Sequence, residues 1–82
     1  MLIKVLAAEG DLSSASNVNT ATVVRLFNNH SAALVITRKD SGGTTIGSFT
    51  LAGNEVAYVE KVAADTLEGG TNIKAAKIAY GN

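Results

Sequence analysis

The chain lacks cysteine, proline and tryptophan, and only four of its 82 residues are aromatic. The absence of cysteine excludes a disulfide-stapled mini-protein, a thiolate zinc site and a thiol enzyme. Hydrophobic residues make up 46% of the sequence, but 13 of them are alanine. A domain of this length therefore has a thin core. Small domains of this kind gain stability from self-association or from docking onto a partner.

The charges are balanced and mixed along the chain, with seven basic and seven acidic residues. The only adjacent basic pair is Arg38-Lys39. Nucleic-acid binding needs several clustered cations, so we expect none. No apolar run is long enough to span a membrane, and we expect no membrane contact. Residues 1–8 resemble a signal peptide, but Lys4 interrupts them and Glu9 follows, so synthesis in the cytoplasm without a signal peptide is expected.

Runs rich in β-branched residues alternate with clusters of Gly, Asn, Ser and Asp, a pattern typical of strands and turns. The predicted strands cover residues 2–7, 22–28, 33–39, 44–52, 56–62 and 73–80. Glycine-containing turns predict hairpins at 40–43 and 52–55. The regular spacing predicts an all-β fold, a small antiparallel β-sandwich or β-barrel of about six to seven strands. Residues 1–82 then form a single β domain.

Two segments are less regular. Residues 55–67 contain no glycine and allow a helix, but Val56 and Tyr58 are strand formers, so a strand followed by a turn at 65–68 is favoured. In the strand at 44–52 the alternation slips at Gly47, which predicts a β-bulge.

The segment 9–20 is rich in Ser, Asn and Asp, with Leu12 and Val18 as isolated apolar anchors. It predicts a long ordered loop or a short edge strand.

The sequence offers no catalytic, metal or cofactor-binding site. His30 is the only histidine, and Asn28, Asn29 and Ser31 around it are turn formers. A general base needs an orienting acid and a nearby nucleophile, and a metal site needs further ligands. The acidic residues lack calcium-loop spacing, and the glycine pairs lack the Lys-Ser/Thr of a phosphate loop. We therefore predict that the protein is not an enzyme and uses no cofactor.

The positions most suited to an interface are apolar residues that a one-sided sheet would leave outside. The strands at 22–28 and 33–39 each carry a second face that is half apolar. Either these are ordinary surface side chains or another chain covers them. The strand within residues 1–7 is apolar and terminal, which suits docking or an edge position. The predicted interface residues are Leu2, Ile3, Val5, Val23, Arg25, Phe27 and Val35.

Several segments together carry a resemblance to a known group of proteins. They are VVRLFNN (23–29), DSGGT (40–44), IGSFTL (46–51), GNEV (53–56), EK (60–61), DTL (65–67) and IKAAK (73–77). Residues 22–80 thereby resemble small virion structural proteins of tailed phages, especially phages of marine bacteria. The segment 9–20 has no counterpart in this resemblance.

The resemblance implies a capsid decoration (cement) protein present in many copies on the virion. Its partners would be the major capsid protein or other virion proteins, together with further copies of itself. A neck, tail or fibre component would carry the same features. A small carbohydrate- or ligand-binding module is the alternative of a different class, and it requires exposed, clustered Tyr58 and Tyr80.

Overall fold

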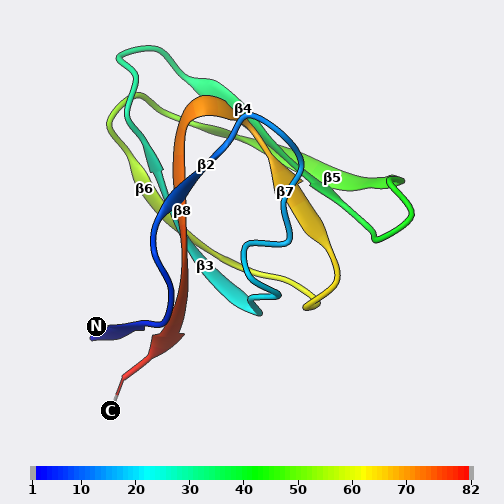
Figure 1. Cartoon of the computed structure of the whole chain (residues 1–82). Helices are drawn as coiled ribbons and strands as arrows, with labels where there is room; N and C mark the ends of the chain where they lie inside the picture. The colour runs from blue at the N-terminus through cyan, green and yellow to red at the C-terminus, as the bar shows by residue number, and fades with distance from the viewer. Residues whose placement is uncertain (1, 82) are drawn as a thin grey trace.

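A computed structural model describes residues 2–81, which contain eight strands and no helix (Figure 1). The strands are β1 (Ile3–Val5), β2 (Gly10–Leu12), β3 (Val23–Asn28), β4 (Leu34–Lys39), β5 (Thr45–Leu51), β6 (Val56–Glu60), β7 (Thr66–Glu68) and β8 (Gly70–Tyr80). They form two antiparallel sheets that are not closed into a barrel. The prediction of an all-β antiparallel fold is confirmed.

The larger sheet has five strands in the order β1-β8-β3-β6, with β2 also paired to β8. The long strand β8 pairs with β3 along one edge and with β1 and β2, one after the other, along the opposite edge. The smaller sheet has three strands in the order β5-β4-β7. Strands β1 and β6 thus lie at opposite edges of the larger sheet, and β5 and β7 lie at the edges of the smaller one.

The core lies between the sheets and is built by alternation along the central strands. Val24 and Leu26 of β3 face Ile36 of β4, and all three are fully buried. The segment 9–20 contributes to this core, because the anchors Leu12 and Val18 are both buried. Side chains of the intervening positions point outward, as the two-residue period of a strand requires.

The predicted hairpin at 40–43 and the predicted bulge are both present. The Asp40 carboxylate accepts hydrogen bonds from the backbone N–H of Gly42 and Thr44 at 2.9 and 3.0 Å. Gly43 has a φ of +89°, which a side chain would strain. In the β4–β5 ladder Arg38 pairs with Gly47 and Lys39 with Thr45, so Ile46 is the extra residue of the bulge.

Two local predictions are wrong in part. Residues 66–68 form the strand β7 rather than the end of a turn, because they pair with the free edge of β4. The segment 9–20 contains the short strand β2, which pairs with β8 and corresponds to the short edge strand among the two predicted alternatives. The turn at 52–55 exists, since Glu55 N–H donates to the Ala52 carbonyl, but it is no hairpin. It carries the chain from the smaller sheet to the larger one.

Three consecutive residues, Val18, Asn19 and Thr20, have φ angles of 53°, 58° and 56°. This left-handed turn is costly for β-branched side chains. It is held by the Asn17 side-chain oxygen, which accepts from the Thr20 N–H, and by the Ala21 N–H, which donates to the Asn17 carbonyl. The burial of Val18 and Ala21 in the core offsets the strain.

The fully buried Asn28 joins the two sheets at the end of β3. Its Nδ2 donates to the carbonyls of Ala32 and Leu51 at 2.9 and 3.0 Å, and its Oδ1 accepts from the His30 N–H at 2.9 Å. Leu51 is the last residue of β5, so one side-chain amide spans from the larger sheet to the smaller one.

At the opposite end of the sandwich, two buried charged groups hold the loops. Lys61 Nζ donates to the carbonyls of Ala21, Val62 and Ala63. Burial lowers the pKa of Lys61, and the charge of Asp65 opposes this shift. The Arg38 guanidinium donates through both Nε and Nη2 to the Asp65 carboxylate. Each buried charge thus has a partner.

Replacing Gly53 by alanine is expected to unfold the turn between β5 and β6. A Cβ at this position would lie 2.2 Å from the Ser31 carbonyl oxygen and 2.9 Å from that of His30, and backbone atoms cannot move away cheaply. Gly53→Ala should lower the free energy of unfolding by about 2–3 kcal/mol, measured by urea denaturation. Gly10→Ala is the matched control, because its Cβ meets nothing within 4 Å. Equal stability of the two variants would contradict the close approach at Gly53.

Replacing Asn28 by leucine is expected to lower the free energy of unfolding by at least about 3 kcal/mol. The change removes three hydrogen bonds and leaves two carbonyls and one N–H without their buried partner. Asn72→Leu, at an exposed position of β8, is the control and should change stability by less than about 0.5 kcal/mol. A small effect of Asn28→Leu in urea denaturation would refute the role of Asn28 in joining the sheets.

Candidate interaction surfaces

The predicted interface residues Leu2, Ile3 and Val5 lie together on a projecting two-stranded ribbon. We call this ribbon, residues 2–6 with 78–81, the arm. Ile3 pairs with Tyr80 and Val5 with Ile78. Residues 78–80 lie beyond the paired part of β3, so the arm extends away from the sandwich with both ends of the chain (Figure 1). Strand β1 is thus part of the protein's own sheet, and its outer edge is unpaired.

The arm exposes most of its large apolar side chains. Leu2 and Val5 are each 70% exposed, and Leu6 and Tyr80 are each more than half exposed. Lys4 lies between the apolar residues of β1 and forms no ion pair with any residue from 2 to 81. The arm is therefore an apolar strand edge with a cationic side chain.

A second group of predicted residues lies on the outer face of the larger sheet. Val23, Arg25 and Phe27 alternate along β3, and the register places Tyr58 beside Arg25 and Val56 beside Phe27. We call these five residues the outer patch. The Arg25 guanidinium lies 6.0 Å from the centre of the Phe27 ring and 3.6 Å from the Glu9 carboxylate. The outer patch combines apolar side chains with one partly exposed cation.

Val35 lies apart from both groups. It is 56% exposed on the outer face of the smaller sheet, where its ladder partner is Thr50. The next pair on the same face of this sheet is Thr37 with Ser48, so the neighbours of Val35 are polar. The structure thus separates Val35 from Val23 and Phe27, and an ordinary surface valine describes it fully.

The two sides of the sandwich differ in how the sheets meet. On one side, backbone hydrogen bonds link Ser16 with Leu67 in both directions, and Gly69 N–H donates to the Leu12 carbonyl. On the other side lie β5 and β6, which within residues 2–81 pair only with β4 and β3, respectively. One side is therefore closed by backbone contacts, and the other is left open between two unpaired strand edges.

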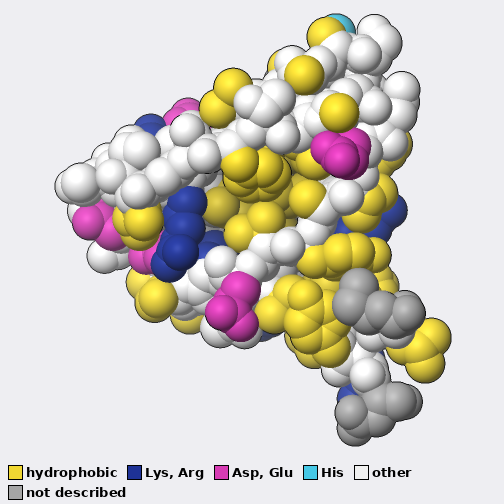
Figure 2. All heavy atoms as spheres, turned by 180° about the vertical axis from the view of Figure 1, so that it is seen from behind, with side chains coloured by type: hydrophobic (Ala, Val, Ile, Leu, Met, Phe, Trp, Pro, Cys, Tyr) yellow, Lys and Arg dark blue, Asp and Glu magenta, His cyan; other side chains and the backbone are white. Residues whose placement is uncertain are grey.

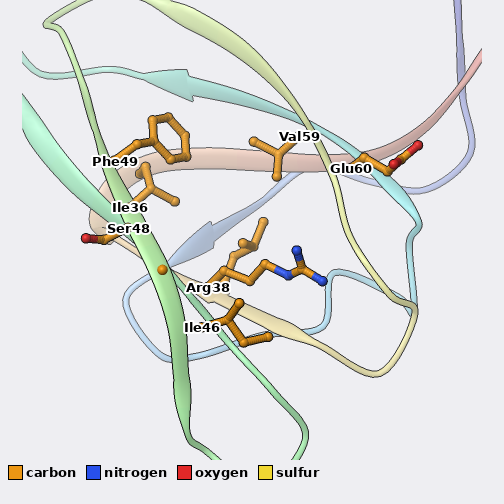
Figure 3. Close-up of a pocket in the computed structure, with 9 residues that line it drawn as sticks. Ile36, Arg38, Ile46, Ser48, Phe49, Val59 and Glu60 are labelled. Carbon is orange, nitrogen blue, oxygen red and sulfur yellow. The ribbon is translucent and has the colours of Figure 1, made fainter.

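The open side contains an apolar groove of about 210 Å³. Phe49, Ile36 and Val59 point toward one another across it, from β5, β4 and β6, and Ile46 extends it along β5 (Figure 3). Hydrophobic side chains gather in a central hollow on the face seen in Figure 2. Ile46 is 52% exposed, although it lies in a strand. A strand edge with exposed apolar side chains is a docking surface for another strand.

Two charged residues border the groove and differ in their partners. Arg38 is neutralised by Asp65. Glu60 is exposed, points away from the hollow in Figure 3, and forms no ion pair within the described part of the chain. The groove border therefore carries one uncompensated negative charge.

Sequence reasoning did not find this groove. Its residues come from three strands whose relative placement depends on which edges remain unpaired. The one usable signal was the slip of alternation between Ile46 and Phe49, which marks the bulge that exposes Ile46.

Tyr58 and Tyr80, which a carbohydrate site would have to bring together, are both exposed but separated. Tyr58 lies on β6 and Tyr80 on β8, with β3 between them. The register places Ala76 of β8 in line with Tyr58, and Tyr80 lies four residues beyond Ala76. Strand spacing and rise place the Cα atoms of the two tyrosines about 16 Å apart. They do not form a shared stacking platform.

The remaining polar groups form no clustered site. His30 Nδ1 accepts a hydrogen bond from the Ala32 N–H and closes its turn. Residues 2–81 contain no group of three or more potential metal ligands. Nor does this part of the chain contain a helix long and apolar enough to cross a membrane.

Comparisons with models of protein families, with curated proteins and with solved structures gave no match to this chain.

Proposed function

We propose that the protein is a structural component of a tailed-phage virion, most specifically a capsid decoration protein that binds the head in many copies. One observation carries this proposal. Ten large hydrophobic side chains are exposed, whereas nine large ones are buried in residues 2–81. The described part of the chain therefore exposes about as many large apolar side chains as it buries.

The energetics favour burial against other subunits. Removing one Val, Leu or Ile side chain from water contributes about 1.5–3 kcal/mol to the binding free energy. A few such residues on each surface therefore offset part of the entropic cost of association. On a particle the same contact recurs in every copy, and linked contacts gain avidity. A formal net charge of zero limits repulsion between densely packed copies.

The outer patch is the surface best suited to the major capsid protein or another virion protein. Interface energy concentrates in tyrosine, arginine and large apolar residues that become desolvated. The outer patch provides Tyr58, Arg25 and Phe27 side by side, and the Arg25 guanidinium lies 3.6 Å from the Glu9 carboxylate.

The copy number in purified virions tests the function directly. We expect hundreds of copies per particle, measured by quantitative mass spectrometry against the major capsid protein. A copy number in the low tens would instead favour a neck, tail or fibre component. Absence from the particle would refute the virion proposal.

Replacing Tyr58 by alanine should weaken rebinding of purified protein to particles that lack it. The loss of one buried aromatic anchor corresponds to about a 30-fold increase in the dissociation constant. Val35→Ala, which removes an exposed apolar side chain outside the outer patch, is the matched control and should bind as the wild type does. Circular dichroism confirms that both variants fold. Unchanged binding by Tyr58→Ala would exclude the outer patch as the contact.

A further inference from the structure

We propose that the arm of one copy of this chain docks at the groove of a second copy, with β1 of the first beside β6 of the second. The larger sheets of the two copies then become one continuous sheet. This inference deepens the proposed function and rests on it, because it assumes that the exposed apolar surface is buried against partner chains.

The two strand edges are complementary in position. In the described part of the chain, β1 pairs only with β8 and β6 only with β3, so each has one unpaired row of backbone donors and acceptors. They lie at opposite edges of the larger sheet, and the arm projects away from the sandwich (Figure 1). The contact is therefore made between copies and not within one.

The side-chain alternation of the two strands also matches. Ile3 and Val5 share one face of β1, and Lys4 lies on the other. On β6, Val59 points into the groove and Glu60 points away from it (Figure 3). When Ile3 and Val5 face the groove, Lys4 lies on the same side as Glu60. Both of these charges are uncompensated within residues 2–81, and they are opposite in sign.

The groove has the capacity for one large apolar side chain of the arm. An apolar cavity of about 150 Å³ accommodates a benzene-sized group, and the groove measures about 210 Å³. Val5 of the incoming arm fits this space and covers Ile46 and Phe49. Those two side chains are otherwise exposed on an edge strand, where another strand is the natural cover.

The resulting contact is heterologous, because the surface used on one copy differs from that used on the next. An open assembly keeps a free arm at one end and a free groove at the other, so it grows until a ring closes or a filament forms. A protein that covers a particle in many copies makes use of such a repeating contact.

Two charge-introducing variants test the contact by sedimentation velocity over a concentration series. Val5→Glu disables the arm, and Ile46→Glu disables the groove; both side chains are more than half exposed, so each variant should fold. Wild-type protein should assemble beyond a dimer, and each variant alone should remain a monomer, with a dissociation constant raised at least about 100-fold. An equimolar mixture should form a 1:1 dimer that does not grow, because each variant retains one working surface.

The matched controls separate this contact from a general effect of charge. Val35→Glu adds the same charge at an exposed valine of the other sheet and should assemble as the wild type does. Lys4→Glu should weaken assembly, and Glu60→Lys in the same chain should restore it.

A wild-type chain that stays monomeric, a mixture without dimer, or variants that assemble normally would overturn the inference. A monomeric chain that still binds particles in hundreds of copies would leave the proposed function standing. A chain that assembles but is absent from particles would refute the proposed function and leave the contact between copies standing.

Discussion

The buried side-chain amide of Asn28 is the interaction on which the rest of this sandwich depends. It is the last residue of β3, and its Nδ2 reaches the carbonyl at the end of β5. Because β5 and β6 share no backbone ladder, the distance between the two sheets at this end is set by that amide and by the turn at 52–55. A buried polar group of this kind is worth retaining only when its hydrogen bonds are satisfied, and those of Asn28 are directed to fixed backbone atoms.

At the other end, Lys61 and the Arg38–Asp65 pair serve the same purpose with charges. Lys61 Nζ donates hydrogen bonds to three carbonyls. The Asp65 carboxylate, in the loop before β7, accepts a hydrogen bond from Arg38 of β4. The groove therefore lies between two hydrogen-bonded ends of the sandwich, with a sheet on each side. The groove is open because, within residues 2–81, no backbone ladder joins β5 to β6.

The sequence predicted the strands that carry their own signal, but it gave β7 as a turn and left the segment of β2 open between a loop and a short edge strand. Runs such as VVRLF in β3 alternate and are β-branched, which is sufficient for a strand assignment. Strands β2 and β7 have three residues each and exist because β8 and β4 offer free edges. The left-handed turn at Val18–Thr20 was equally unreadable, because tertiary burial of Val18 overrides its local preference. The groove was missed for the same reason: which edges stay unpaired is a property of the whole topology. The predicted interface residues were separated onto three surfaces.

The absence of proline has a further meaning at the strand edges. Proteins usually protect exposed edges with proline, lysine, bulges or short strands. Here β5 contains no charged residue and β6 only Glu60, and the bulge in β5 turns Ile46 outward instead of hiding it. An edge with so little protection would pair with any available strand. Specificity must therefore come from the partner, and an arm whose apolar and cationic positions match those of the groove supplies it. The single acid at the border of the groove then selects the register in which Lys4 and Glu60 meet.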